Sequence, residues 1–416
     1  MKKIFIISAF SLFLCTTSTL AQDNLVSSKA VETKAATAAD AFPERFFHYN
    51  IRGSLTNSYL KFSRGGKARV AFLGGSITEM KGWKNMLEEF FKKTFPQTEF
   101  EFVEAGIPSM GSTPHSFRMK TDVLAKGKID LLFVEAAPND DTNEFTPLEQ
   151  VRGMEGMVRQ AWLADAETDI IMLHFIWDGF IGMHKAGRRP DVIYNHERVA
   201  NHYRVPSIDL NQEINERMEA GQFTWKDFGG QHPAPFGHSF YTATIERVMK
   251  LMWNEIGKDA KITPHELPEK PLDEYSYFGG DFINISEAKL GKGWQIVTPW
   301  HPDNKYTKRP GFVDVPMLET KTVGSKLTLD FEGKAIGICC VAGPYAGILE
   351  YSVDGRPFKK LDTYTHWSGY LYIPWVYMFE TELGDTSHRL TLRMSKEKNE
   401  VSKGNECQIR NFVVNK

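Results

Sequence analysis

The sequence predicts an α/β domain with a parallel sheet, followed by a second domain that is an antiparallel β-sandwich. Short apolar runs alternate with amphipathic stretches from Arg69 to about Gly257, and this alternation is typical of parallel strands connected by helices. The composition then shifts to Pro, Lys and Glu, which indicates a linker. Beyond the linker, short alternating strands with turn residues replace the helical pattern.

The N-terminus has the three parts of an export signal. These are two lysines, a short apolar run and small residues before a cleavage point: Lys2 and Lys3, Ile4–Leu14, and Thr19-Leu20-Ala21. Cleavage is expected after Ala21, so residues 1–21 are predicted to be removed and the protein to be periplasmic or extracellular. Cys15 offers a lipoprotein alternative, but Leu14 stands where lipid attachment requires a small residue. Residues 22–41 are rich in Ala, Ser and Thr and are predicted to be flexible.

The first domain is predicted over residues 42–257. Its expected strands are Val70–Leu73, Phe100–Glu104, Leu131–Glu135, Ile170–Phe175 and Ser207–Leu210. Its expected helices lie near Trp83–Thr94, Ser116–Ala125, Pro147–Ala164, Val192–His202 and Phe236–Ile256. In this architecture helices cover both faces of the sheet, and an active site forms at the carboxyl ends of the strands.

Residues 258–273 are predicted to be a linker because three prolines there interrupt any helix: Pro264, Pro268 and Pro271. Residues 274–416 are predicted to form an antiparallel, jelly-roll-like β-sandwich. Its expected strands include Lys326–Phe331, Ala335–Val341, Gly347–Val353 and His388–Met394. Asp354-Gly355 follows one of these strands and is a hairpin turn signal.

Composition and charge argue against several classes of function. The chain has 50 basic and 52 acidic residues and a formal charge of −2, which gives no electrostatic basis for binding nucleic acid or an anionic membrane. After the signal, no stretch is suited to stable membrane insertion. Cys339, Cys340 and Cys407 are odd in number and lack metal-ligand spacing, so we expect buried thiols instead of disulfides or a metal site. No cofactor is predicted, and the oligomeric state stays open.

Four segments carry the residues that suggest chemistry, and each falls in a loop next to a strand or helix. They are Phe72–Thr78, Ala105–Ser112, Glu135–Asp140 and Asp227–Pro233. In the first segment two glycines allow a sharp turn, and Ser76 stands where a helix begins. Such a serine is either a helix cap or a nucleophile. Asn139 and His232 are ordinary loop residues when taken singly, but the order of the four segments favours a catalytic role.

These segments resemble, in residues and in order, the motif blocks of the SGNH (GDSL-like) hydrolase superfamily. Gly-Gly-Ser-Ile-Thr is similar to the first block and Gly106–Gly111 to the second. Pro138-Asn139-Asp140 resembles the third block, and Asp227–Pro233 with Gly237 resembles the fifth. The resemblance covers about half of the chain, from Gly65 to Gly257. It implies a flavodoxin-like, three-layer α/β/α domain and a serine hydrolase.

The resemblance also implies a role for each matching residue. Ser76 Oγ would attack an ester carbonyl, and His232 would accept its proton and pass it to the leaving alcohol. The oxyanion would be held by the Ser76 N–H, by the Asn139 side chain and by a backbone N–H of the second block. Ser109 stands where the family has its donor glycine, and Gly111 follows two residues later. Both remain candidates, with Gly111 slightly preferred.

Two departures from the family pattern concern this site. Gly75 replaces the usual Asp of the first block, which is not a triad member. The triad Asp is expected three residues before His232, where Gly229 stands. Asp227, five residues before the histidine, is the candidate triad acid if Gly229 and Gly230 let the loop bulge. The alternative is a Ser–His dyad in which a backbone carbonyl orients the imidazole.

Aromatic and charged residues populate the loops of the expected active face, where they either bind a sugar or serve the structure of the loops. They are Glu79, Trp83, Arg118, Trp177, Asp178, His184, Arg188 and Arg189. Aromatic rings stack on sugar rings, while charged groups bind hydroxyls or uronates. No pattern suggests an apolar lid, which weakens a lipase interpretation.

An exported SGNH domain followed by a β-sandwich resembles bacterial carbohydrate esterases, which remove acetyl groups from glycans. The predicted function is therefore a secreted serine esterase that removes acyl groups, above all O-acetyl groups, from a carbohydrate. Five aromatic residues of the second domain are expected to be mostly core, with an exposed subset able to bind glycan: Trp367, Tyr370, Tyr372, Trp375 and Tyr377.

Two alternatives stay open at this point. The scaffold could cleave a glycosidic bond or another acyl or sulfate ester, and a carboxylate pair such as Glu79 with Asp178 would favour the glycosidase. A non-catalytic glycan-binding protein is the second alternative. The missing triad Asp favours it, whereas the intact Ser76, Asn139 and His232 oppose it.

Overall fold

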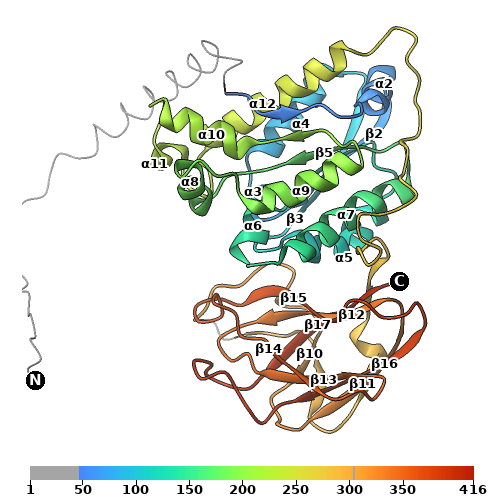
Figure 1. Ribbon diagram of the computed structural model, residues 1–416, viewed down its shortest axis with the longest axis vertical. Helices are drawn as coiled ribbons and strands as arrows, with labels where there is room; N and C mark the ends of the chain where they lie inside the picture. The colour runs from blue at the N-terminus through green and yellow to red at the C-terminus, as the bar shows by residue number, and fades with distance from the viewer. Residues whose placement is uncertain (1–45, 303–304) are drawn as a thin grey trace, which may run out of the picture. The chain divides into compact units, whose positions relative to one another are not determined.

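The computed structural model describes residues 46–302 and 305–416 (Figure 1). The predicted export signal and residues 22–41 lie outside these residues. Glu44–Lys416 forms one compact unit, so the two predicted domains pack together as one body. Among the described helices, none combines the length and the hydropathy that crossing a membrane requires.

The first domain is built on a six-stranded sheet. In spatial order its strands are β1 (Tyr49–Asn50), β6 (Ser207–Ile208), β5 (Asp169–Leu173), β4 (Leu131–Glu135), β2 (Gly66–Gly74) and β3 (Thr98–Gly106). All neighbours are parallel except β1, which runs antiparallel to β6. Counted from β2, the parallel strands have the order 2-1-3-4-5 of flavodoxin-like folds. The predicted fold class is confirmed.

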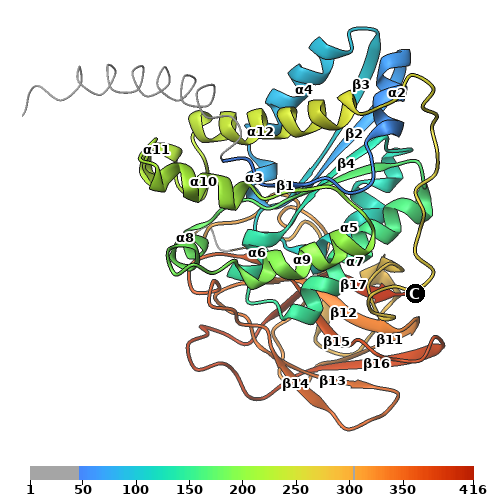
Figure 2. The ribbon, with the colours of Figure 1, turned by 45° about the horizontal axis from the view of Figure 1, so that its top comes forward.

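Helices cover both faces of this sheet (Figure 2). One face carries α4 (Trp83–Thr94) and α12 (Pro235–Asn254), and the other carries α5 (Ser112–Asp122), α7 (Pro147–Ala164) and α9 (Asp191–His202). Successive side chains of β2 point to opposite faces. Phe72 therefore packs edge-on against Trp83 of α4, while Leu73 joins the core that contains Met154 of α7.

Shorter helices fill the loops of this domain. They are α2 (Thr56–Arg64), α3 (Ser76–Glu79), η1 (Leu124–Lys126), α6 (Ala137–Thr142), α8 (Asp178–Lys185), α10 (Leu210–Glu219) and α11 (Trp225–Phe228). The segment after the fourth parallel strand, expected to be a long loop, contains α8. Two glycines in α8 weaken its helical signal, but the buried Phe180 ties it to the domain.

The second domain has two antiparallel sheets. The first contains β15 (Ile373–Glu380), β12 (Ala335–Ala342), β17 (Cys407–Asn415), β10 (Met317–Thr320) and β9 (Trp294–Val297), with β7 (Gly280–Ile283) paired to β17. The second contains β14 (Lys359–Asp362), β13 (Ile348–Val353), β16 (Ser387–Met394), β11 (Lys326–Glu332) and β8 (Lys289–Leu290), and η2 (Ile285–Glu287) precedes β8. Asp354 and Gly355 both have positive φ and join β13 to β14, as their turn signal predicts.

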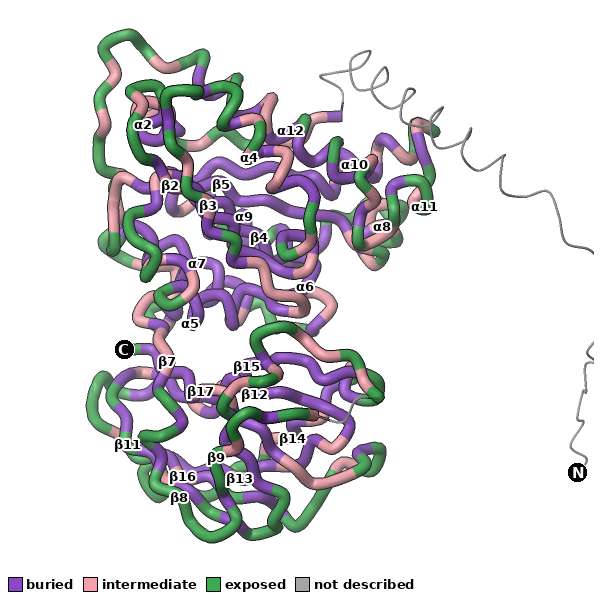
Figure 3. The backbone as a smooth tube through the Cα atoms, turned by 180° about the vertical axis from the view of Figure 1, so that it is seen from behind, coloured by how far each residue is buried: buried purple, intermediate pink, exposed green. Residues whose placement is uncertain are grey.

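The strands β10, β12, β15 and β17 of the first sheet are mostly buried on both faces (Figure 3), whereas its edge strand β9 is partly exposed. Cys340 of β12 lies in the core between the two sheets. Its neighbour Cys339 points the other way, into a cluster shared with the first domain that includes Phe117 of α5. Cys407 is also buried, so all three thiols are interior, as expected. The two domains are therefore joined by an apolar core and not only by a linker.

Candidate active site

The first predicted segment places Ser76 at the carboxyl end of β2. The strand ends at Gly74, and α3 begins at Ser76. Neither glycine has positive φ, so the reason for them is space. A Cβ on Gly74 would overlap the carboxylate of Glu135, and one on Gly75 would overlap the amide of Asn139. The Asp that the family usually has at the position of Gly75 therefore does not fit in this arrangement.

Glu135, the last residue of β4, stabilises this turn by hydrogen bonds. Its Oε1 accepts hydrogen bonds from the Gly75 N–H at 2.6 Å and from Thr78 Oγ1 at 2.7 Å. Burial raises the pKa of Glu135 to about 7, while these two hydrogen bonds favour its ionised form. The sequence predicted the strand that ends here but not this contact with the first segment.

Ser76 and His232 meet in the structure. Ser76 Oγ lies 2.9 Å from His232 Nε2, within hydrogen-bond distance. Partial burial lowers the pKa of His232, and so does the positive charge of Arg309, whereas Glu79 raises it. The lowered pKa favours the neutral imidazole, which is the state that accepts a proton.

Asp227 is not brought to His232. Its Oδ2 accepts hydrogen bonds from Thr224, from the backbone N–H at 3.0 Å and from Oγ1 at 2.7 Å. The carboxylate therefore caps α11, and these bonds lower its pKa. Gly229 and Gly230 do adopt positive φ, but the turn they make leaves Asp227 exposed. Within the described residues, no carboxylate is hydrogen-bonded to His232, so the expected triad contact is not formed and a Ser–His pair remains.

The second segment forms a turn in which Ser109 takes a conformation suited to glycine. The Met110 N–H bonds to the Ile107 carbonyl at 3.4 Å, with Pro108 and Ser109 between them. Ser109 has a φ of 71°, as the third residue of a type II turn requires. The glycine expected here from the resemblance would take this positive φ without strain, whereas the side chain of Ser109 makes the same conformation less favourable. Neither the Ser109 N–H nor the Gly111 N–H has a partner among the described residues, so both stay candidate oxyanion donors.

Asp140 fastens the second segment to the third. Its carboxylate accepts from the Ser112 N–H and Oγ, both at 2.6 Å, and contacts His196 Nε2 at 2.9 Å. Both Asp140 and His196 are fully buried. Gly111 packs so closely on this carboxylate that a Cβ would overlap it. The preceding residue, Asn139, is 8% exposed, and its side-chain amide bonds to no group in the described chain.

Two of the predicted sugar-binding residues lie in the interior, and the prediction for them was wrong. Trp83 is 0% exposed and donates its Nε1–H to the Ile77 carbonyl at 3.2 Å. Arg118 is 2% exposed and donates to the backbone carbonyls of Gly74 and Ala105. Each side chain points to the buried face of its helix, where a sugar cannot reach.

The other predicted sugar-binding residues are at least partly accessible. Glu79 is exposed at the end of α3, and Trp177 is half-buried before α8. Asp178 accepts a hydrogen bond from Trp225 Nε1, and Arg188 is exposed. Two more make ion pairs: His184 with Glu219 at 3.2 Å, and Arg189 with Asp209 at 2.9 Å.

Arg309, from the second domain, was not predicted at this site. It lies in the connection between β9 and β10, and its Nε donates to Ser109 Oγ at 3.2 Å. Arg309 is the first residue of a turn in which the Phe312 N–H donates a hydrogen bond to the Arg309 carbonyl at 3.2 Å. Pro310 and Gly311 are the two central residues, and Gly311 has a positive φ. Pro-Gly is a readable turn signal, but no sequence pattern indicates which part of the first domain this turn meets.

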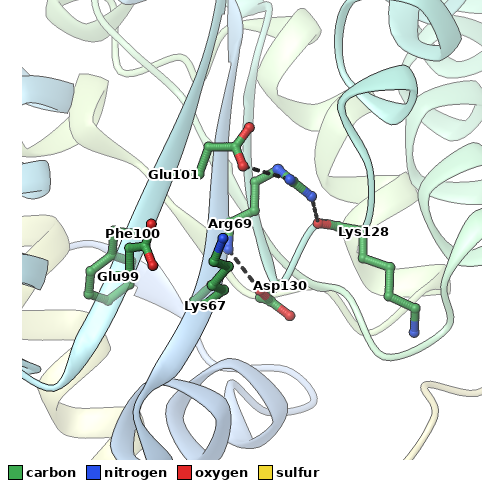
Figure 4. Close-up of a pocket in the computed structure, with 8 residues that line it drawn as sticks. Lys67, Arg69, Glu99, Phe100, Glu101, Lys128 and Asp130 are labelled. Atoms are coloured by element: carbon green, nitrogen blue, oxygen red, sulfur yellow. Dashed lines mark hydrogen bonds and ion pairs between the residues drawn. The ribbon is translucent and has the colours of Figure 1, made fainter.

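A separate hollow lies at the opposite edge of the sheet, near the amino ends of β2 and β3 (Figure 4). Arg69 crosses it and pairs with Glu101 at 2.6 Å, while its backbone N–H bonds to Asp130 at 2.8 Å. Functional sites of such sheets form at the carboxyl edge. The edge that carries Ser76 is therefore the candidate active site.

Compared by sequence alone, the chain matches no protein-family model and no curated protein. Its structure, however, is similar to the crystal structure of a two-domain esterase (CEX) active on acetylated mannans, co-crystallised with mannopentaose. The two share 22% identity with a TM-score of 0.70, over 87% of this chain and 95% of that chain. The chain has the fold of a two-domain esterase. A second crystal structure of a CEX esterase active on acetylated mannans gives 22% identity and a TM-score of 0.69, over 87% and 96% of the two chains. The two-domain esterase fold thus extends across both domains.

Proposed function

We propose that this protein is a secreted carbohydrate O-acetylesterase in which Ser76 is the nucleophile and His232 the general base. The observation that carries the proposal is the 2.9 Å hydrogen-bond contact between Ser76 Oγ and His232 Nε2 at the carboxyl edge of the sheet. Ser76 follows β2 and Asn139 follows β4. These are the two strands between which the strand order reverses, where flavodoxin-like folds bind their ligands.

The reaction proceeds by two acyl transfers. His232 Nε2 takes the proton of Ser76 Oγ as this oxygen bonds to the acetyl carbonyl carbon, and the carbonyl oxygen becomes an oxyanion. Collapse of this intermediate breaks the bond to the sugar oxygen, which receives the proton from His232. Water then attacks the acetyl group on Ser76 with His232 again as base, and acetate leaves. The N–H of Ser76, the amide of Asn139 and a backbone N–H of Ser109 or Gly111 hold the oxyanion, each worth about 3–4 kcal/mol.

The pair works as a dyad in this proposal, so Asp227→Asn should change kcat by less than about tenfold at neutral pH, far below the ~10⁴-fold cost of losing a triad acid. The asparagine oxygen can still accept from Thr224 and cap α11. The measurement is kcat on an aryl acetate across pH. Thr224→Ala is the matched control, because it removes the same cap and should cost about 1 kcal/mol of stability. A loss near 10⁴-fold in Asp227→Asn alone would restore the triad.

Three observations support a carbohydrate as the alcohol part of the ester. The similar two-domain esterase is active on acetylated mannans and was crystallised with mannopentaose. The loops after the parallel strands carry the accessible Glu79 and Trp177, and Arg309 contacts Ser109 in one of these loops. These groups suit sugar hydroxyls and sugar rings. The sequence also predicts export, which gives access to polysaccharides.

The alternatives account less well for the same residues. A glycosidase needs a free pair of carboxylates, whereas Asp178 is engaged by Trp225. A non-catalytic binder would give no role to the contact between Ser76 and His232.

The test is acetate release from acetylated mannan and acetylated xylan, with reducing-end formation followed in parallel. We expect acetate without new reducing ends. New reducing ends would favour the glycosidase, and neither product on any acetylated glycan would overturn the proposal.

A further inference from the structure

Two opposite charges lie on segments next to the candidate site, and they come from different domains. Glu79 is the last residue of α3, whereas Arg309 belongs to the β9–β10 connection. Both act on the imidazole, since Arg309 lowers the pKa of His232 and Glu79 raises it. Glu79 also raises the pKa of Arg309, which burial lowers. No direct ion pair joins the two within the described chain, so neither charge is neutralised by contact with the other.

Arg309 is held in place from the side of the first domain. Its Nε–H donates to Ser109 Oγ at 3.2 Å. Three residues later, Phe312 lies in the apolar cluster that also contains Met110. The turn and the packing of Phe312 fix the backbone of Arg309 and the start of its side chain. The two terminal guanidinium nitrogens bond to no other group in the part of the chain that the structure describes, and the side chain is only partly buried.

The partner that suits a carboxylate and a guanidinium together is a neutral hydroxyl. A hydroxyl donates its hydrogen to a carboxylate and accepts from a guanidinium at the same time. The negative charge of a uronate would be attracted by Arg309 but repelled by Glu79. The positive charge of an amino sugar would be attracted by Glu79 but repelled by Arg309. In an acetylated sugar, the hydroxyl on the carbon next to the ester lies beside the ester oxygen. It therefore comes close to His232 when Ser76 attacks.

We propose that Glu79 and Arg309 form a subsite that binds the free hydroxyl on the sugar carbon adjacent to the acetylated one. The inference rests on the proposed function and adds a specificity to it. The second domain thereby supplies part of the recognition of the substrate. Hydrogen bonds to charged groups are stronger than those between neutral groups, so losing this contact should cost about 10- to 100-fold in kcat/KM.

The first arm of the test compares two soluble substrates. One is a monoacetylated methyl mannoside with a free neighbouring hydroxyl, and the other is its analogue in which that hydroxyl is replaced by hydrogen. The wild type should prefer the first by about 10- to 100-fold in kcat/KM. Arg309→Ala and Glu79→Gln should each remove most of this preference. Arg356→Ala, an exposed arginine in the β13–β14 turn, is the matched control and should keep it.

The second arm follows the acid limb of the pH profile of kcat/KM on an aryl acetate, which has no sugar hydroxyl. This limb reports His232, which must be neutral to act as base. Removing the positive charge in Arg309→Ala should raise the pKa of His232 and move the limb to higher pH. Removing the negative charge in Glu79→Gln should move it to lower pH. Arg309→Lys keeps the charge and should leave the limb near its wild-type position.

The outcomes separate the two proposals. If the wild type cleaves the aryl acetate but neither mannoside, the proposed function fails. If it cleaves both mannosides equally well, or if Arg309→Ala lowers both by the same factor, the function stands and the subsite is overturned. Shifts of the acid limb in the same direction for Arg309→Ala and Glu79→Gln would also contradict it, because damage to the fold does not depend on the sign of the removed charge. Thermal unfolding of each variant checks that the fold is intact.

Discussion

Ser76→Ala is expected to lower kcat for ester hydrolysis by about 10⁴- to 10⁶-fold, as removal of a serine nucleophile does in enzymes of this mechanism. The reason is that no bond to the acyl group can form, while the binding groups around it stay in place. Ser76 Oγ contacts His232. Replacing the hydroxymethyl side chain of Ser76 with the methyl group of alanine should leave the fold unchanged. The measurement is single-turnover and steady-state hydrolysis of an aryl acetate, with thermal unfolding as the check on stability.

Ser239→Ala provides the control for this variant. Ser239 is an exposed serine at the start of α12, near His232 in sequence, and its Oγ donates to the Phe236 carbonyl. It should retain wild-type kcat. Retention of more than a few per cent of activity in Ser76→Ala would remove this residue from the mechanism.

Asn139→Ala is expected to lower kcat by about 10²- to 10³-fold with little change in KM, which is the cost of losing one oxyanion donor. The amide lies against Gly75 and has no other hydrogen-bond partner in the described residues. Asn139→Asp keeps the shape of the side chain but replaces the donor by a negative charge, so it should lose at least as much.

Gly75→Ala tests whether the position of the Asn139 amide matters, because it leaves Asn139 in the chain but displaces its side chain. Its Cβ would overlap Asn139, so the amide must move and part of the same loss in kcat should appear. Unchanged kcat in Asn139→Ala would show that backbone groups alone hold the oxyanion.

Much of the first domain is predictable because its signals are local. The helices at Trp83–Thr94 and Pro147–Ala164 and the strand at Leu131–Glu135 begin and end where the periodicity predicts. The helix α8 escaped prediction because its glycines weaken the local signal, whereas its stability comes from the tertiary burial of Phe180.

The positions of the candidate site residues follow from the sequence where a residue is fixed by its own loop, and they do not where a contact depends on distant residues. Ser76, Asn139 and His232 each follow a turn that the sequence contains, and the fold brings Ser76 to His232 and Asn139 against Gly75. Asp227 can bond either to His232 or to Thr224, where it caps α11, and the structure shows the bond to Thr224. Residue spacing alone does not reveal which of the two contacts forms. Arg309 lies more than two hundred residues from Ser76 and reaches the site only through packing between the domains.

Covalent labelling measures the central claim most directly. The protein is treated with a fluorophosphonate that reacts with activated serines, the modified peptide is identified by mass spectrometry, and acetate release from acetylated mannan is followed as labelling proceeds. The account predicts one label per chain, on Ser76, with acetate release falling in proportion to the labelled fraction. Complete inactivation with the label on another residue, or full activity in protein labelled at Ser76, would contradict it.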